Sequence, residues 1–422
     1  MSGSELRAIV EAEAAAAARA APLLADEPVR EALAAAAALV RERRDTVLDA
    51  NRADCEATEG RLDEGMLDRL RLDDGRVGSL AEQLEATAAL PPLEREGGSW
   101  TLENGLRVSE RRVPIGAVGA NFEARPNVAL DVAGQLLKSL NAAVLRTGGA
   151  ALRTVTVLVD EVLRPALERA GLPSEAVGLV RSPDREGARL LVSLPHVVPL
   201  VVLRGSGETT AALARLAAEN GVRTLAHAEG GGVLYVHGSA DPERALGLVD
   251  ASLDRLGVCN RLNLLLVDAE ARGMLDDLLG ALRARGVDPV GGPRAAEAAG
   301  LERHDGRLGH EWANDADRVS TATVELVADL EEALRIANGE TSGLAAGIVA
   351  EDEAAAERFL DGYRGSAAFW HAPTRFADGY ELLGAPETGI NVDWVPGPRG
   401  PVSYRDLWLR QYRIVGDGTQ RR

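Results

Sequence analysis

The sequence has only two cysteines, Cys55 and Cys259, and they stand far apart in the chain. Such a pair makes neither a disulfide framework nor a zinc-binding motif. The six histidines lack the spacing of a metal site, and the G-x-S-x-G motif of many serine hydrolases is absent. We therefore expect no metal ion and no serine nucleophile.

Long apolar runs are also lacking, because no stretch approaches the ~20 residues that span a bilayer. The N-terminus carries acids among its alanines and has no basic segment leading into an apolar one, unlike a secretion signal. The formal net charge of −18 repels a phosphate backbone. These absences predict a cytoplasmic protein with free thiols that binds neither membranes nor nucleic acid.

What is present is the composition of an ordinary globular protein, with 46% hydrophobic and 27% charged residues. Its 422 residues are enough for two or three domains. Residues 5–90 have apolar positions at helical spacing. Residues 99–114 predict a hairpin with Asn104-Gly105 as a two-residue turn. The edges of such a hairpin need covering, and a partner subunit is one way to cover them.

Continuous apolar strands then alternate with helices, first over 113–237 and again towards the C-terminus. This pattern predicts an α/β protein with two doubly wound parallel-sheet domains. Parallel sheets bind ligands at the carboxyl ends of their strands. The glycine-rich segments 146–149, 204–208 and 228–232 all follow predicted strands of the first set.

Two of the strand ends carry polar groups. After Arg146, the pair Gly148-Gly149 offers free backbone N–H groups to a phosphate, although such a pair is also common in purely structural turns. In "NFEARPNV", Arg125 is suited to hold a carboxylate or phosphate. Asn127 either stabilises an oxyanion or simply caps the following helix.

Cys259 stands in "LDRLGVCNRLNLLLV", where a helical pattern ends and an apolar strand begins. A lone cysteine is usually a small buried apolar residue. Its place in a turn introduced by Gly257, outside the strand, equally suits a nucleophile beside a backbone N–H.

Together, these segments resemble gamma-glutamyl phosphate reductase (glutamate-5-semialdehyde dehydrogenase), a branch of the aldehyde dehydrogenase superfamily. The matching stretches follow the family's order between residues 113 and 418. They are "VPIGAVGANFEARPNVALDVAGQLLKSLNAAVLR", "VVLRGSG", "GVCNRLNLLLV", "PTRFADG", "GAPETGINVDWVPGPRGP" and "YRIVGDG".

The resemblance implies reduction of gamma-glutamyl phosphate by NADPH, in proline biosynthesis. Cys259 would attack the acyl phosphate to leave a thioester, with Asn127 and the Cys259 N–H at the oxyanion. The cofactor residues it implies are Arg146, Gly148, Gly149, Gly205 and Glu387. The substrate residues it implies are Glu123, Arg125, Asn260, Thr374 and Arg375.

The same resemblance implies an aldehyde dehydrogenase-like architecture with a small β arm for oligomerisation. We expect a cofactor-binding domain over 1–253, made of a helical part (1–98), a hairpin arm (99–113) and the first sheet. A catalytic domain follows over 254–375, and 376–422 returns to the cofactor domain and ends in an oligomerisation segment. A dimer or tetramer is expected, and so is a transient contact with the kinase that supplies the acyl phosphate.

The chain departs from the family at several positions. Leu140 stands where the family has glycine, Thr147 precedes the glycine pair, and His371 replaces an asparagine. Arg261 and Asn263 differ beside the cysteine.

These departures leave alternatives open. The chain could be a paralogue that reduces another acyl phosphate or oxidises another semialdehyde. Glu229 stands near the general base of hydrolytic aldehyde dehydrogenases. A catalytically silent scaffold partner of a kinase is a third alternative, against which the retention of Cys259 together with Glu387 argues.

Overall fold

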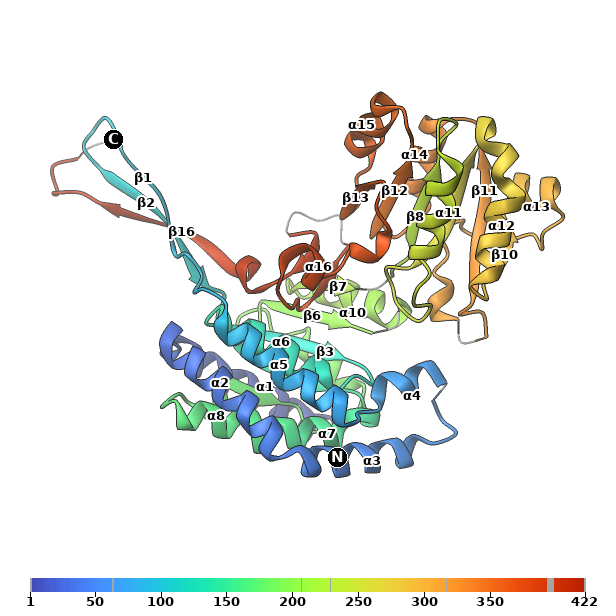
Figure 1. Ribbon diagram of the computed structural model, residues 1–422. Coiled ribbons are helices and arrows are strands. Elements are labelled where there is room, and N and C mark those ends of the chain that lie inside the picture. Colours follow the sequence, from blue (N-terminus) through green and yellow to red (C-terminus); the bar gives the residue numbers. More distant parts are fainter. Residues whose placement is uncertain are drawn as a thin grey trace.

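The computed structural model describes residues 2–62, 64–205, 207–227, 229–315, 317–392 and 398–420. Two parallel sheets, each flanked by helices, make up the body of the molecule, and a long antiparallel arm projects away from both (Figure 1). The predicted α/β class with two doubly wound domains and an arm is confirmed.

The N-terminal part is helical, as predicted. Its helices begin with α1 (Gly3–Ala20), where Ser2 and Glu5 form a capping box that satisfies free N–H groups. Their apolar faces pack on the first sheet in one continuous core. The other elements are η1 (Ala21–Leu23), α2 (Asp26–Glu42), α3 (Arg44–Thr58), α4 (Glu64–Leu70) and α5 (Asp74–Ala89). Cys55 is an ordinary residue of α3 that lies against this core.

The first sheet has the strand order β5-β4-β3-β6-β7, and all its pairs are parallel. Successive strands are added on one side of β3 up to β5 and then on its other side from β6, so the carboxyl ends of β3 and β6 flank the switch point where ligands bind. The strands are β3 (Ala117–Phe122), β4 (Ala142–Thr147), β5 (Val177–Leu179), β6 (Leu200–Arg204) and β7 (Arg223–His227). The connections are α6 (Asn127–Lys138), η2 (Gly149–Ala151), α7 (Leu152–Val157), the π-helix η3 (Leu158–Leu163), α8 (Arg164–Arg169), η4 (Ser174–Ala176), α9 (Glu186–Leu191) and α10 (Gly207–Glu219).

The second sheet has the order β10-β11-β9-β8-β12-β13, again parallel throughout. Separate apolar clusters cover its two faces, one with α11 and α12 and the other with α14 and α15. The strands are β8 (Gly232–Val236), β9 (Leu262–Asp268), β10 (Asp288–Gly291), β11 (Thr321–Val327), β12 (Ala345–Val349) and β13 (Ala367–Trp370). The helices are α11 (Pro242–Ala251), η5 (Ala269–Met274), α12 (Leu275–Ala284), α13 (Pro293–Ala299), η6 (Trp312–Asn314), α14 (Leu330–Gly339) and α15 (Glu353–Gly362).

The domain boundary at 253 needs correction. β8 and α11 belong to the second sheet and its core, so sheet membership changes between β7 and β8. Both strands are apolar, and the sequence pattern does not say which sheet a buried strand joins. The glycines between them, Gly230 and Gly231, mark the actual crossing.

After β13 the chain returns to the first domain through η7 (Thr374–Phe376), α16 (Gly379–Leu383), β14 (Gly389–Asn391), β15 (Gly400–Val402) and η8 (Tyr404–Asp406). β14 contacts β7, and Tyr404 N–H donates to Gln135 of α6 at 2.9 Å. The chain then enters the arm as β16 (Trp408–Val415).

The arm consists of β1 (Glu96–Thr101), β2 (Arg107–Pro114) and β16 in the order β1-β2-β16 (Figure 1). The predicted hairpin is present, but its turn is longer than two residues. Thr101 pairs with Arg107, and Leu102 N–H closes on the Leu106 carbonyl at 2.8 Å. The chain's own strand β16 covers the β2 edge of the hairpin, an edge for which the sequence suggested a partner subunit as one possible cover.

Leu140, which replaces the family's glycine, adopts a left-handed backbone conformation with φ +61°. It follows α6, where its N–H bonds to Leu137 and the next N–H bonds to Leu136. Helices commonly end on a glycine in this conformation, because a Cβ is strained there. The side chain is 8% exposed, so burial offsets the backbone cost.

We predict that Leu140→Ala is less stable than Leu140→Gly by about 1 kcal/mol, since both lose the buried side chain but only alanine keeps the strain. Chemical denaturation measures the difference. Glu82, exposed within α5, is the matched control, where alanine should be the more stable of the pair. Alanine more stable than glycine at position 140 would contradict the strain.

Candidate functional site

Cys259 lies in the turn between α11 and β9, as predicted. It is partly buried against an apolar cluster that includes Ala345, Ala377 and Ile390. Arg69 of α4 reaches this turn and donates to the Gly257 carbonyl at 3.4 Å. The thiol therefore lies where the turn between α11 and β9 meets the helical part of the first domain.

The glycines before β8 hold the backbone of the cysteine turn. Gly231 N–H donates to the Cys259 carbonyl at 2.6 Å, and Gly232 N–H donates to the Arg261 carbonyl at 2.7 Å. A Cβ on Gly230 would lie 2.5 Å from both Cβ and O of Cys259. Gly231 has φ +104°, which disfavours any other residue. The approach is so close that only glycine fits.

Asn260, Thr374 and Arg375, which we expected at the substrate, brace the other side of the turn. Thr374 Oγ1 donates to the Asn260 carbonyl at 2.8 Å, and the Asn260 amide donates to the carbonyls of Arg375 and Ala377. Arg375 in turn pairs with Asp254 at 2.5 Å and bonds to Asn260 Oδ1. These contacts connect η7 to the cysteine turn through buried polar groups.

The thiol is poorly ionised in this structure. Burial raises the pKa of Cys259 to about 11, and the carboxylate of Glu311 acts in the same direction. Arg125 and Arg204 act in the opposite direction and lower the thiol pKa. Two of the charges that surround the nucleophile are therefore cationic and come from the first domain.

Arg125 follows β3, at the end that faces the ligand side of the sheet. Burial lowers the pKa of its guanidinium to about 10, with Arg204 and Arg69 adding to the effect, so it remains charged at pH 7. The preceding residue, Ala124, has φ +42°. Such strain is uncommon outside glycine and clusters at functional sites.

Asn127 opens α6 and donates through Nδ2 to Asp131 at 3.1 Å. Burial raises the pKa of Asp131 to about 6, against the lowering effect of Arg204 and of this hydrogen bond. The N-cap position itself belongs to Pro126, and Asn127 does not cap the helix through its side chain. Asp131 thus fixes the orientation of the Asn127 amide.

Glu387 lies close to the thiol, since its charge raises the pKa of Cys259. Its Oε2 accepts the Gly379 N–H at 2.7 Å. Burial in turn raises the pKa of the Glu387 carboxyl. Directly after β6, a Cβ on Gly205 would lie 3.3 Å from the carboxylate of Glu123. These two predicted site residues are therefore also neighbours.

Arg146, which we expect to bind the cofactor, has partners within the protein. It is 3% exposed, and its guanidinium donates to Asn121 Oδ1 at 3.1 Å and to the Asp184 carbonyl at 2.9 Å. Gly148 and Gly149 follow it at the start of η2, where Gly148 N–H bonds to the Phe122 carbonyl. Arg146 is thus engaged within its own domain.

The departures beside the cysteine have structural explanations. Asn263 accepts the Trp312 N–H at 3.1 Å and donates to the His310 carbonyl at 2.6 Å. It thereby holds the segment whose Glu311 accepts the Gly230 N–H at 2.6 Å. Arg261 is buried, and its guanidinium donates to the Thr321 carbonyl at 2.7 Å.

Glu229, the candidate hydrolytic base, pairs with Arg307 at 2.8 Å, and its side chain is 46% exposed.

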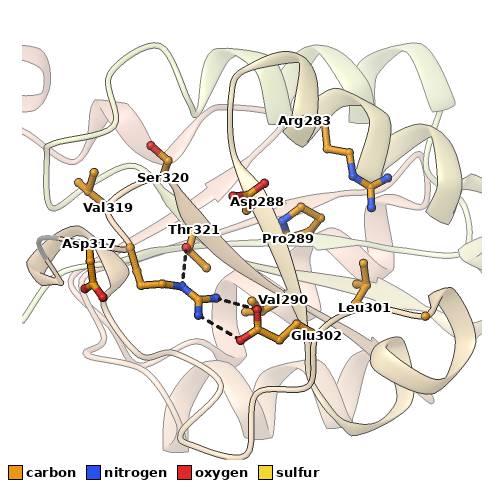
Figure 2. Close-up of a pocket in the computed structure, with 12 residues that line it drawn as sticks. Arg283, Asp288, Pro289, Val290, Leu301, Glu302, Asp317, Val319, Ser320 and Thr321 are labelled. Carbon is orange, nitrogen blue, oxygen red and sulfur yellow. Dashed lines mark hydrogen bonds and ion pairs between the residues drawn. The ribbon is translucent and has the colours of Figure 1, made fainter.

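A separate hollow of about 550 Å³ lies at the amino ends of β10 and β11 (Figure 2). Its wall mixes charged and uncharged residues, and Arg318 forms an ion pair with Glu302 there. None of the predicted site residues lines it.

Sequence reasoning missed Arg204, Asp131 and Glu311. Arg204 ends an apolar strand directly before Gly205, which is a recognisable signal for a strand-end ligand residue. Asp131 is a single acid within the otherwise apolar α6. Glu311 had no local signal, because it reaches the thiol through a tertiary contact with Gly230.

Across the described ranges, no group of three or more His, Cys, Asp or Glu side chains is arranged to hold a metal ion. No helix in the same ranges is both long and apolar enough to cross a membrane.

Comparison with known proteins shows what the chain is similar to. Residues 4–285 match the model of the aldehyde dehydrogenase family. A gamma-glutamyl phosphate reductase of Clavibacter michiganensis is 39% identical over 92% of this chain and 89% of its own. The enzyme of that name from Rhodospirillum rubrum is 35% identical over 92% of this chain and 90% of its own.

Solved structures agree in fold. The crystal structure of gamma-glutamyl phosphate reductase from Thermotoga maritima superposes with a TM-score of 0.89, at 27% identity, over 98% of this chain and all of the other. An engineered glycolyl-CoA reductase with bound NADP+ superposes with a TM-score of 0.69 at 15% identity, over 96% of each chain.

We predict that Gly230→Ala disrupts the cysteine turn, lowering stability by about 1–3 kcal/mol and Cys259-dependent activity by more than about tenfold. Gly257→Ala is the matched control in the same turn, because a Cβ there meets nothing within 4 Å. Thermal unfolding and turnover measure both effects. Equal behaviour of the two variants would contradict the close approach.

We predict that Glu311→Gln lowers the pKa of Cys259, because it removes a negative charge while keeping an oxygen for Gly230 N–H. In a Cys55→Ser background, iodoacetamide should alkylate Cys259 severalfold faster at pH 8, on the order of tenfold for one pKa unit. Glu302→Gln, which removes an exposed acid of the same domain, should leave the rate unchanged. An unchanged or slower rate in Glu311→Gln would refute the electrostatic coupling.

Proposed function

Because the chain belongs to the aldehyde dehydrogenase family, and within it to the gamma-glutamyl phosphate reductases, we propose that it reduces gamma-glutamyl phosphate to glutamate-5-semialdehyde and phosphate through a Cys259 thioester. The membership rests on the matched family model and on curated relatives above 30% identity over most of the chain. The chain is thus an oxidoreductase that acts on an aldehyde or an acyl phosphate. The observation that carries the proposal is a partly buried thiol in the turn before β9, whose pKa is lowered by the charges of Arg125 and Arg204 and raised by that of Glu387.

In the first step, the Cys259 sulfur attacks the carbonyl carbon of the acyl phosphate. The new S–C bond forms as the C–O bond to phosphate breaks, and the electron pair leaves with the phosphate oxygen. Phosphate is a good leaving group that needs little protonation, which suits a site where Arg125 stays charged. The step needs a thiolate, and the nearby guanidiniums favour that form.

The tetrahedral intermediate of this attack carries a negative oxygen. We assign its stabilisation to the backbone N–H of Cys259 and to the amide of Asn127. The hydrogen bond from Asn127 Nδ2 to Asp131 fixes the plane of that amide. Because burial raises the pKa of Asp131 to about 6, its carboxylate is mostly ionised at pH 7 and accepts this bond.

The reduction requires a nicotinamide cofactor of the kind used by this family, which donates a hydride when it is bound. The residues fit such a group at the reacting end, where the partly buried Glu387 adjoins the thiol and is suited to a ribose hydroxyl pair. Gly205, which directly follows β6 and lies beside Glu123, is assigned to the cofactor from the family resemblance.

We propose NADPH as the cofactor from the family resemblance. A direct contact of Arg146 with its 2′-phosphate would require the guanidinium to leave Asn121 and the Asp184 carbonyl. The Gly148 N–H is likewise engaged, with the Phe122 carbonyl, and Gly149 follows it at the start of η2.

Asn260, Thr374 and Arg375 position the nucleophile in this proposal and need not touch the substrate. Their hydrogen bonds join the cysteine turn to η7. Glu123 and Arg125, from the strained segment after β3, remain the proposed substrate-side residues.

We further propose that copies of the chain associate in the cytoplasm through the arm. The arm exposes large apolar side chains, among them Trp100, Tyr412 and Ile414, that a neighbouring copy would cover. A transient contact with the kinase that makes the labile acyl phosphate would fit the same pathway.

We predict phosphate-dependent reduction of NADP+ with glutamate-5-semialdehyde, and at least about a thousandfold loss of this activity in Cys259→Ala. Cys55→Ala should retain it, because Cys55 lies in α3 away from the site. Absorbance of the reduced cofactor measures the rate. Full activity in Cys259→Ala would refute the thioester, and activity on other semialdehydes alone would identify a paralogue.

A further inference from the structure

Arg125 and Arg204 are exceptional among the partly buried arginines. In the ranges that the structure describes, neither guanidinium donates a hydrogen bond to the protein or forms an ion pair. Arg164, Arg318 and Arg375, by contrast, each pair with a carboxylate. A partly buried guanidinium without a direct hydrogen-bond acceptor is costly, and burial lowers the pKa of Arg125 accordingly. Such a pair calls for an anionic ligand.

The sheet brings these two arginines together. β3 and β6 are adjacent and parallel, with Phe122 in register with Arg204, so Arg204 ends its strand just where β3 ends. Arg125 follows three residues beyond Phe122, after the left-handed Ala124. Gly389 of β14 also lies beside the Arg204 side chain, since a Cβ there would lie 3.7 Å from its Cδ, an ordinary contact distance.

The pair also lies near the nucleophile. Gly389 of β14 lies beside the Arg204 side chain, and the next residue, Ile390, packs in the same apolar cluster as Cys259. Both guanidiniums lower the pKa of Cys259. In a chain whose formal net charge is −18, two cations held at adjoining strand ends are suited to an anionic ligand.

We propose that Arg125 and Arg204 together bind the phosphoryl group of the substrate, and inorganic phosphate in the reverse reaction, within reach of Cys259. This assignment rests on the proposed function and extends it to the leaving group. Two guanidiniums can each offer a pair of parallel N–H donors to a phosphate dianion. As the C–O bond breaks, the negative charge grows on the oxygen that these donors hold. In reverse, a held phosphate oxygen attacks the thioester carbon and the sulfur leaves with the electron pair.

The test needs no turnover. In a Cys55→Ser background, Cys259 is alkylated with iodoacetamide at constant ionic strength while inorganic phosphate is titrated. Phosphate should slow the alkylation with a saturable dependence, because it covers the thiol and neutralises the arginines that favour the thiolate. Arg125→Gln and Arg204→Gln should each raise the half-saturating phosphate concentration by about tenfold or more. Arg204→Lys should restore part of the effect.

Arg215→Gln is the matched control, because Arg215 is exposed on α10 in the same domain. It should titrate like the parent protein. Thermal unfolding of each variant shows that the fold persists, and the lysine variant keeps the comparison valid if glutamine destabilises the strand end. Equal half-saturation in the parent, Arg125→Gln and Arg204→Gln would overturn the proposal.

A second titration distinguishes binding of the phosphoryl group from binding of the other anion of the substrate, its α-carboxylate. L-glutamate replaces phosphate in the same titration. Protection by glutamate that depends on Arg204, with phosphate protection unaffected by the substitutions, would overturn the phosphoryl assignment. Steady-state kinetics add that Arg204→Gln should raise the KM for phosphate and leave the KM for NADP+ unchanged.

These outcomes are distinct from failure of the proposed function. Arginine-dependent protection by phosphate in a protein that lacks activity on glutamate-5-semialdehyde would support the anion site and refute the substrate. Phosphate-dependent activity with protection independent of both arginines would support the reaction and overturn the site.

Discussion

The contact between the Gly230-Gly231 linker and the backbone of Cys259 is the constraint on which the site depends. It joins the crossing between the two sheets to the turn that carries the nucleophile, through a 2.6 Å hydrogen bond from Gly231 N–H to the Cys259 carbonyl. Because a Cβ on Gly230 would overlap Cys259, the linker lies flush against the turn. The position of the thiol relative to the first sheet therefore follows from the path of a few glycines.

Two further sets of contacts hold the cysteine turn. One involves Asn263, which differs from the family, and the other involves Asn260 and Thr374, which we expected to contact the substrate. Asn263 anchors the segment of Glu311, which closes on Gly230 from the opposite side. Asn260 and Thr374 connect the turn to η7. The altered residues beside the nucleophile thus act on the framework of the site, while the arginines that face the thiol come from the other domain.

The fold could be predicted largely from the alternation of apolar strands and helices, and the strands over 117–236 all appear where the pattern places them. The sequence pattern does not predict β10, because its residues, Asp288–Gly291, include a proline and are too few for a periodic signal. The sheet to which β8 belongs and the pairing of β2 with β16 are non-local, and a local pattern carries no information on them. In the site, Cys259 and Arg125 stood out by their place at element ends. Asp131 and Glu311 did not, because single acids acquire a role only from their tertiary neighbours.

The arm has a consequence for how the protein is made. β1 and β2 precede both parallel sheets in the chain, whereas β16, the second partner of β2, follows both. Until β16 is synthesised, the nascent chain presents one edge of β2 as an unpaired row of backbone groups. Contacts of such high sequence separation form slowly, and open strand edges promote association of incomplete chains. The charged side chains along β2, among them Arg107, Glu110 and Arg112, therefore protect an edge that stays open until β16 is made.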